Sequence, residues 1–444
     1  MNGFYANCEE TVRDIKKKAC SYDYVRFSYA DINGICRAKI VPSRNVEAIL
    51  KSGGIGLCSA ILLLDASSNY VPLPYLEADG YPDCHVFPGE GTFSPCPWSG
   101  NDNFNIAEVL CSFHWRGTLR YLEADPRALC LKMTKKLEQK LSVECYNAFE
   151  YEFVLFDKKK EKAAFDGKDI CATLVFKEVE ELHYLIDKRL LNADVNVQTL
   201  QVEYGPGQNE IVIEPRFGIT GADAAFRLKS CVKETSAEMG YHATFMSKPF
   251  ETDVVTNSGH WNHSLWDDRG NNVMYDPSKP TGLSELAMWW IGGICAHAPA
   301  LCAIICPTTN CYRRIVPGTW APCNIGWGID RRDLMLRVKT GTKNNTYIEC
   351  RSASSAANPY LVMAAMIAAG LDGIENKIQP PDEGTIFQRL PLSLQEALDA
   401  LDADEVLKSA MGDEFILWYR QAKRECDCKT QNFEDEKNMY LKLI

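Results

Sequence analysis

The stretch that most constrains the fold is residues 150–157, EYEFVLFD, in which acidic residues interrupt an apolar run typical of a β-strand. Glu150 and Glu152 are two residues apart, so both would project from the same face of a strand. Two carboxylates on one face repel each other unless a cation lies between them. That cation can be a lysine or arginine, or a divalent metal such as Mg²⁺ or Mn²⁺, because hard cations bind carboxylate oxygens.

Further acids of the same kind lie later in the chain. Glu203 and Glu210 flank Gly205-Pro206-Gly207, a turn that can bring a second pair of carboxylates back toward one point. Glu349 lies in a strand-like segment, and His260 follows a glycine in a polar loop. Each of these residues taken alone is more often structural than catalytic. Together, the acids and the imidazole favour a shared metal or catalytic site.

Residues 310–322, NCYRRIVPGTWAP, form a second informative stretch. Pro317 and Gly318 cannot continue regular structure, so the stretch predicts a strand or extended arm that leads into a loop. The adjacent Arg313 and Arg314 suggest a clamp for a carboxylate or phosphate, because guanidinium presents a planar fork of donors. The alternative is a solvated arginine pair on a surface loop.

The composition limits the class of protein. With 444 residues, 46% of them hydrophobic, the chain can bury a large core and is expected to form two domains. The net charge of −11 is spread along the chain without a basic block, so nucleic acid is not an expected partner. No apolar run reaches the roughly 18 residues that a membrane span requires, and the polar N-terminal segment predicts no signal peptide. The 19 cysteines form no CxxC pattern, which favours reduced cysteines in a cytoplasmic protein.

The secondary-structure patterns change near residue 118. The patterns before it predict one helix and two short strands between turns rich in Gly and Pro, at 7–20, 25–29 and 60–64. After it, Asp125 is a suitable N-cap and Pro126 suits the first helical position, which predicts a helix through Lys140.

Strands and helices then alternate, and the last part of the chain is helical. The patterns predict a strand at 150–156, a helix at 177–192, strands at 202–203 and 210–217, and a helix at 222–239. Asn358 is a suitable cap and Pro359 a suitable first residue for a long helix that ends near Gly370. From Leu394 onward, helices with acidic and basic faces are expected to serve packing and assembly.

In chain order, five stretches resemble the active-site segments of class I glutamine synthetases: 150–157, 203–214, 257–267, 310–322 and 347–360. The resemblance covers nearly the whole sequence, and HSLWD, ANPYLVMAAMIAAGLDGI and LPLSLQEALDALDADEVL further resemble the lengsin branch. It implies an α+β fold, with a small β-grasp-like N-terminal domain at 1–118 and a catalytic domain at 119–444 built on a curved antiparallel sheet and helices. It also implies a homo-oligomer of two stacked hexameric rings, a dodecamer.

The resemblance implies two bound Mg²⁺ or Mn²⁺ ions. One family metal is held by three glutamates, which match Glu152, Glu203 and Glu210. The other is held by two glutamates and a histidine, which match Glu150, His260 and Glu349. The same resemblance assigns Asn257 to glutamate binding and Ser264 to nucleotide binding.

The family reaction transfers the γ-phosphate of ATP to the γ-carboxylate of glutamate, and ammonia then attacks the acyl phosphate. Phosphoryl transfer depends mainly on positioning and charge neutralisation, which metals and arginines supply. The family arginines that bind glutamate or the transferring phosphoryl group match Arg314, Arg332 and Arg351, of which Arg314 and Arg332 are candidate catalytic residues. Arg337 matches the arginine at the nucleotide phosphates, although spacing alone favours a salt-bridged strand face for Arg332 and Arg337.

Four positions depart from the family pattern. Trp320 stands where the family has a glutamate that deprotonates ammonium, and Cys58 stands near its second ammonium-binding acid. Asn262 occupies the place of the second family histidine, with His263 displaced by one position, and Tyr347 replaces an arginine near the nucleotide. An indole offers an apolar or π surface, which suits an organic amine better than ammonium.

Three functional hypotheses follow. The first is an ATP-dependent γ-glutamyl ligase that joins glutamate to an amine, with ammonia a poor or lost substrate. The second is a catalytically inactive, lengsin-like assembly protein that keeps the fold. The third is ordinary glutamine synthesis, which would require another group to accept the ammonium proton.

Overall fold

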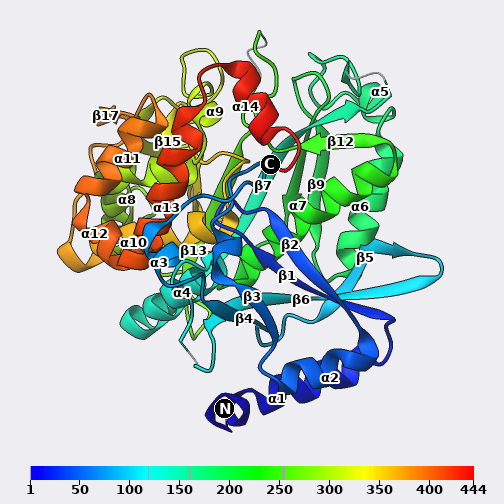
Figure 1. The fold of residues 1–444 in the computed structure, drawn as a ribbon. Coiled ribbons are helices and arrows are strands. Elements are labelled where there is room, and N and C mark those ends of the chain that lie inside the picture. The colour runs from blue at the N-terminus through cyan, green and yellow to red at the C-terminus, as the bar shows by residue number, and fades with distance from the viewer. Residues whose placement is uncertain (1, 119, 160–161, 253–255) are drawn as a thin grey trace.

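The computed structural model describes residues 2–118, 120–159, 162–252 and 256–444, and two β-sheets organise them. The smaller sheet, blue to cyan in Figure 1, has the strand order β2-β1-β6-β4-β3, with β5 paired to β6. Its strands are β1 (Tyr24–Ala30), β2 (Cys36–Pro42), β3 (Ile55–Cys58), β4 (Asp83–Pro88), β5 (Ser94–Asn101) and β6 (Phe104–Trp115). The accompanying helices are α1 (Asn2–Ala19), α2 (Ser43–Lys51), a 3₁₀ turn (Ser59–Leu62) and α3 (Pro74–Ala78).

The larger sheet has the order β17-β14-β15-β16-β13-β7-β10-β9, and β8, β11 and β12 also pair with β7. All of its described pairings are antiparallel except that of β14 with β15. The strands are β7 (Val143–Asp157), β8 (Lys162–Ala163), β9 (Val197–Val202), β10 (Gln208–Ile213), β11 (Arg216–Phe217), β12 (Tyr241–Thr244), β13 (Gly259–Asp267), β14 (Asn324–Ile329), β15 (Leu334–Lys339), β16 (Tyr347–Cys350) and β17 (Gln388–Arg389). The 15-residue strand β7 therefore pairs with five other described strands: β8, β10, β11, β12 and β13.

Helices flank the larger sheet. In the view of Figure 1, α8 and α10–α13 gather at the left, and α6 and α7 lie at the right. The bounds are α4 (Pro126–Leu141), α5 (Thr173–Phe176), α6 (Glu180–Asn192), α7 (Thr220–Glu238), α8 (Glu285–Ile305), α9 (Thr309–Tyr312), α10 (Pro359–Asn376), α11 (Leu394–Ala403), α12 (Glu405–Met411), α13 (Asp413–Glu425), a 3₁₀ turn (Asp427–Lys429) and α14 (Phe433–Tyr440). The expected mixed α+β fold with a large, mainly antiparallel sheet is confirmed.

Two helix starts follow the capping chemistry that the sequence predicts. The Asp125 side chain accepts a hydrogen bond from the backbone N–H of Arg127 at the start of α4. Asn358 likewise accepts from Tyr360 at the start of α10. In both helices a proline occupies the first turn, where its missing N–H has no helical partner to lose. The predicted starts of these helices are therefore confirmed.

Helices α8 and α10 pack closely because glycines lie at their contact. A Cβ atom at Gly293 would lie 2.2 Å from the carbonyl oxygen of Ala369, and one at Gly370 would lie 2.3 Å from the Trp290 ring. Among the described helices, α8 alone is long and apolar enough to cross a membrane by length and composition, but 72% of that window is buried inside the protein. Its apolar character is accounted for by packing in the core.

Most predicted elements are present with shifted ends. The helices predicted at 7–20, 177–192 and 222–239 correspond to α1, α6 and α7, and the strand at 25–29 to β1. The strand predicted at 210–217 is divided into β10 and β11, because Pro215 lacks an N–H to pair between them. The strand predicted at 60–64 is wrong, since residues 59–62 form a 3₁₀ turn.

The extended arm predicted within 310–322 is also wrong. Its first residues belong to α9, and a loop follows. The Asn310 side chain accepts from the N–H of Lys248 and donates to the Lys248 carbonyl and to Glu436. These contacts stabilise a compact helical turn in place of a strand.

One buried and one partly buried ion pair join the smaller sheet to α7. Arg26 in β1 pairs with Glu234, and Arg227 pairs with Glu108 in β6. The division of the chain at residue 118 and the β-grasp-like character of the first part stay predictions.

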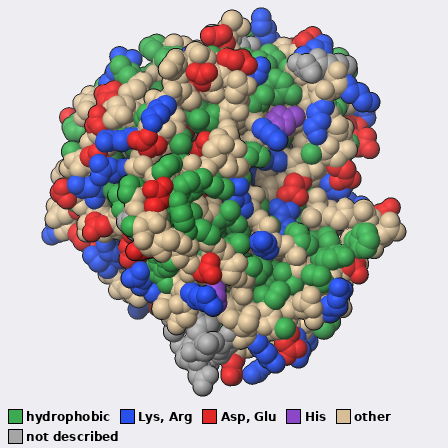
Figure 2. Space-filling view, viewed as in Figure 1, with side chains coloured by type: hydrophobic (Ala, Val, Ile, Leu, Met, Phe, Trp, Pro, Cys, Tyr) green, Lys and Arg blue, Asp and Glu red, His purple; other side chains and the backbone are tan. Residues whose placement is uncertain are grey.

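On the face shown in Figure 2, acidic and basic side chains are interspersed.

Candidate active site

A cleft of about 780 Å³ opens on the larger sheet. Its lining includes every residue that the sequence predicts as a metal ligand: Glu150, Glu152, Glu203, Glu210, His260 and Glu349. Three of the predicted arginines also line it, as does the tryptophan that differs from the family pattern: Arg332, Arg337, Arg351 and Trp320. The remaining lining residues are Ile170, Gln201, Tyr204, Gln208, Thr256, Ser258 and Thr319. Segments far apart in the sequence thus contribute to one site.

Strand register brings the acids together. In the pairing of β7 with β10, Glu152 lies directly opposite Glu210. In the pairing of β7 with β13, Glu150 lies opposite His260. The pairing of β13 with β16 places Glu349 opposite Asn262, two residues from His260 on the same face. Directly opposite residues have Cβ atoms about 5 Å apart, so the sheet itself fixes the spacing of the site.

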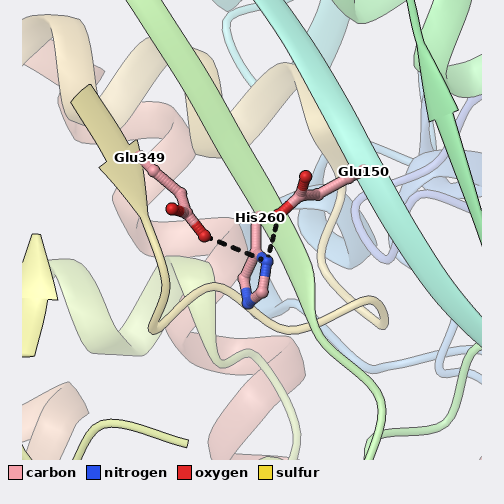
Figure 3. Close-up of side chains that lie close together, drawn as sticks. All are labelled: Glu150, His260 and Glu349. Atoms are coloured by element: carbon pink, nitrogen blue, oxygen red, sulfur yellow. Dashed lines mark hydrogen bonds and ion pairs between the residues drawn. The ribbon is translucent and has the colours of Figure 1, made fainter. Parts of the chain in front are cut away.

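Glu150, His260 and Glu349 form the tightest cluster, as Figure 3 shows. One ligand atom from each residue lies within 4.8 Å of the others. Nδ1 of His260 contacts the Glu150 carboxylate and lies 3.4 Å from Glu349. The other ring nitrogen, Nε2, is buried without a hydrogen-bond partner among the described residues. A buried, unpartnered imidazole nitrogen beside two carboxylates is the arrangement expected of a metal ligand.

Glu152, Glu203 and Glu210 form the second set, on β7 and around β10. Glu152 accepts from the Ser258 N–H at 2.7 Å, and Glu203 accepts from Gln201 at 2.6 Å. Among the described residues, only Glu150, His260 and Glu349 have ligand atoms that all lie within 4.8 Å of one another. The second set is therefore more open.

The pKa values of these acids reflect burial first and neighbouring charges second. Burial raises the pKa of Glu152 to about 7. Burial together with the surrounding carboxylates raises the pKa of Glu210 to about 9. Glu150 differs, because His260 and nearby arginines outweigh its burial and lower its pKa. A divalent cation would relieve this repulsion, and carboxylate oxygens with one imidazole are a donor set that Mg²⁺ or Mn²⁺ accepts. The residues therefore fit the predicted metals.

The cleft arginines are held by Glu349 and its neighbours. Arg337 donates to Glu349 at 3.0 Å and to Asp330 at 3.2 Å, as expected for a salt-bridged strand face. Arg351 pairs with Glu349 and donates through Nε to the Arg332 carbonyl at 3.2 Å. Arg332 is exposed beside them on the turn before β15. The alternative of a salt-bridged face is therefore observed for Arg337, which also faces the cleft.

Arg314 lies beneath the cleft and is not among its lining residues. It is 1% exposed, and it donates to the carbonyls of Ser352 and Arg351 and to the Ser258 hydroxyl, at 2.7–2.9 Å. Burial lowers its pKa. Its neighbour Arg313 instead pairs with Glu436 at 2.7 Å. The adjacent arginines thus point to different partners, and Arg314 supports the backbone that carries Arg351.

Two further predicted residues are buried outside the cleft lining. Asn257 donates to the Met246 carbonyl at 2.9 Å and accepts from Gln208 at 3.2 Å. The Ser264 hydroxyl accepts from Trp266 at 2.8 Å. The structure therefore brings Asn257 into contact with a cleft residue, whereas Ser264 lies farther along β13.

Sequence reasoning missed Gln208, which donates to Glu152 at 3.3 Å and accepts from the Gly205 N–H at 2.9 Å. It could have been found from spacing, because Gln208 and Glu210 are two residues apart on one strand face. Ile170 and Tyr204 carried no such signal, since they lie in irregular segments.

The departing positions have different environments. Trp320 is 86% exposed at the cleft mouth, with a backbone φ of 61°. Tyr347 is partly buried in β16, and Cys58 is exposed at the end of β3. His263 faces away from the cleft, where it stacks on Trp261 at 3.9 Å, and burial lowers its pKa to about 3. His263 therefore cannot serve in place of the second family histidine, whose position is expected to be occupied by Asn262.

The comparisons with known proteins show the family to which the chain is similar. Residues 123–439 match the family model described as "Glutamine synthetase, catalytic domain". A glutamine synthetase from Thermotoga maritima is 32% identical over 457 residues, an alignment that covers 97% of this chain and 99% of the relative. A glutamate–isopropylamine ligase from a Pseudomonas species is 31% identical over 434 residues, 93% of each chain.

Solved structures show the same fold. A structure described as a novel glutamine synthase homolog superposes with a TM-score of 0.84 at 25% identity, over 94% of this chain and 97% of that chain. A GmaS/ADP complex superposes with a TM-score of 0.81 at 26% identity, over 98% of this chain and 99% of that chain. The fold and the acidic cleft match those of the glutamine synthetase-like ligases, a family whose members use ATP and divalent metals. The chain belongs to the glutamine synthetase catalytic-domain family.

Proposed function

We propose that the protein is an ATP-dependent γ-glutamyl ligase that joins glutamate to an organic amine in preference to ammonia. The observation that carries the proposal is a cleft that is lined by all six predicted metal ligands and has Trp320 exposed at its mouth. A relative named glutamate–isopropylamine ligase, of nearly the same length, supports the same class of reaction.

The cleft residues divide the work of the first step. Glu152, Glu203 and Glu210 would hold one divalent ion, and Glu150, His260 and Glu349 the other; when bound, these ions would neutralise phosphate charge. Arg332 and Arg337 face the same space and would bind the phosphoryl oxygens. Arg351, oriented by Glu349 and the Arg332 carbonyl, would bind a glutamate carboxylate. Asn257 would act on glutamate binding through its hydrogen bond with Gln208 in the cleft lining, and Ser264 is assigned to the nucleotide by the family resemblance alone.

The second step forms the amide. The amine nitrogen attacks the γ-carbonyl carbon of γ-glutamyl phosphate, the C–N bond forms and the C–O bond to the phosphoryl group breaks. The phosphate leaves with the bonding electron pair and takes the proton that the nitrogen sheds. An indole accepts a proton from neither ammonium nor an alkylammonium ion, so the acceptor attacks as the neutral base. The indole does offer an apolar face to the alkyl group of a substituted amine, which ammonia lacks. Trp320 therefore disfavours ammonia and favours a substituted amine.

The test is phosphate release from ATP, with Mg²⁺ and glutamate, across ammonia, methylamine, ethanolamine and polyamines. We expect release that depends on an organic amine and responds little to ammonia. Release with ammonia alone would overturn the choice of acceptor and leave ordinary glutamine synthesis.

A second candidate is a lengsin-like, catalytically inactive assembly protein. The replacements at Asn262, Trp320 and Tyr347 favour it, because they depart from the family pattern for ammonium and nucleotide binding, although only Trp320 lines the cleft. Silence across the whole amine panel, from folded and assembled protein, would select this candidate.

Assembly and location belong to the same proposal. The family resemblance supports a dodecamer of two stacked hexameric rings, with a β-grasp-like domain at 1–118 and a catalytic domain at 119–444. The cysteine pattern supports a cytoplasmic location. Light scattering after size-exclusion chromatography tests the ring number. A mass well below about twelve chains would contradict it.

A further inference from the structure

The mouth of the cleft carries an unusual amount of exposed apolar surface. Ile170 is 54% exposed, Tyr204 is 44% exposed and Trp320 is 86% exposed, and all three line the same cleft. Large apolar side chains left in water at a substrate cleft mark a surface that a ligand covers. We define these three residues as the apolar rim.

Backbone hydrogen bonds hold one side of the apolar rim in place. The N–H of Lys168 donates to the Tyr204 carbonyl at 2.6 Å, and the N–H of Cys171 donates to the Val202 carbonyl at 3.0 Å. A Cβ atom at Gly167 would lie 2.5 Å from the backbone of Pro206, so the two segments are in direct contact. Ile170 and Tyr204 therefore form one preorganised wall, although they are 34 positions apart in the chain.

The other side of the apolar rim is Trp320. The hydroxyl of the preceding Thr319 donates to the carbonyls of Arg314 and Val316, at 2.6 and 2.7 Å. Trp320 itself has a φ of 61°, a left-handed conformation that bulky residues rarely adopt. A strained backbone that holds an indole in solvent at a cleft mouth suggests a functional role for that indole.

Charge at the cleft limits what the apolar rim can accept. The carboxylates that line the cleft are all predicted metal ligands: Glu150, Glu152, Glu203, Glu210 and Glu349. Once these acids hold cations, none of the described lining residues offers a free carboxylate to a second ammonium group. A diamine or polyamine would therefore place its distal charge against apolar side chains without a partner, which is unfavourable.

We propose that the apolar rim selects a primary monoamine with an alkyl substituent, and that Ile170 and Tyr204 set the size of that substituent. This inference rests on the proposed ligase function and specifies its acceptor. The amine nitrogen points into the cleft toward the acyl phosphate, and the alkyl group covers the rim. Each added methylene buries more apolar surface, so kcat/KM rises by about 3-fold per carbon until the rim is covered.

The experiment measures phosphate release by the full-length protein with ATP, Mg²⁺ and glutamate. The acceptors are ammonia, methylamine, ethylamine, propylamine, butylamine and butane-1,4-diamine. For wild-type protein we expect kcat/KM to increase along the alkyl series, and butylamine to exceed the diamine by about 10-fold or more. A flat alkyl series, or equal use of butylamine and the diamine, would overturn the inference.

Variants at the rim separate its effect from general catalysis. Tyr204→Ala and Ile170→Ala should each reduce the butylamine-to-methylamine ratio of kcat/KM by about 3-fold, mainly through the KM for butylamine. Leu174→Ala is the matched control, because Leu174 is 82% exposed on the neighbouring α5 and outside the cleft lining. An unchanged ratio in both rim variants would contradict the assignment.

The two proposals fail in different ways. Wild-type activity with ammonia alone, or silence with every acceptor, would remove the proposed ligase function and the rim together. Activity with organic amines but without dependence on alkyl length would leave the ligase function standing and remove only the rim.

Discussion

The floor of the cleft consists of the predicted metal ligands, and its mouth is the apolar rim. The two differ in the kind of backbone structure that carries them. The floor acids lie on or next to paired strands, where register places Glu152 opposite Glu210 and Glu150 opposite His260. The mouth residues Ile170, Tyr204 and Trp320 lie in loops and turns. The floor acids are the predicted metal ligands, and the mouth contains Trp320, which is expected to depart from the family pattern. Loops can therefore change the acceptor without disturbing the sheet that positions the metals and phosphates.

The largest effect that tests this comparison is expected from Glu210→Gln. Removing one floor carboxylate weakens a predicted metal site, so activity with every amine should fall by about 100-fold or more. Glu210 lies among other carboxylates, so the neutral amide should not destabilise the metal-free fold by more than about 1 kcal/mol. Phosphate release and thermal stabilisation by Mn²⁺ measure the two effects.

Glu214→Gln is the control for this substitution. Glu214 follows β10, is exposed and accepts from Asn196 at 3.0 Å, outside the cleft lining. It should keep activity and Mn²⁺ stabilisation. Full activity in Glu210→Gln would contradict the assignment of the floor to metal binding.

The same contrast explains how far the sequence could predict the structure. The acids of the floor follow a two-residue period on strands, and capping residues such as Asp125 and Asn358 mark helix starts, so both were predictable. The burial of Arg314 was not, because it depends on carbonyls from residues 351 and 352 that only the tertiary fold brings near. Ile170 joins Tyr204 through loop hydrogen bonds that have no sequence period.

A smaller effect is expected at the mouth from Trp320→Glu. A carboxylate at this position would attract ammonium and accept its proton, so kcat/KM with ammonia should rise by about 10-fold while alkylamine use falls. The measurement is phosphate release with ammonia and with the best alkylamine.

Trp320→Phe is the matched control, because it keeps an aromatic face without adding an acid. It should retain the preference for the organic amine. No gain of ammonia use in Trp320→Glu, from protein that still binds Mn²⁺, would mean that the mouth does not select the acceptor.

The smallest expected effect is on stability and concerns His297, which lies outside the cleft. Measuring it separates the pH dependence of folding from the pH dependence of activity in the cleft. His297 in α8 lies 2.6 Å from Asp404 and 3.0 Å from Asp372. Burial by itself lowers its pKa, but hydrogen bonds to these carboxylates outweigh burial and raise the pKa above the ordinary value.

Because the folded-state pKa of His297 is raised, its stabilising contribution is complete below the unfolded-state pKa near 6.5 and is lost as pH rises through the folded value. The contribution should be at most about 1 kcal/mol after solvent screening. The thermal midpoint of the wild type should therefore fall more between pH 6 and pH 8 than that of His297→Gln. His85→Gln, in β4 of the smaller sheet, controls for the loss of an imidazole. Equal pH slopes in wild type and His297→Gln would show that the ion pair contributes no pH-dependent stability, and any pH dependence of acceptor choice would then have to come from the cleft.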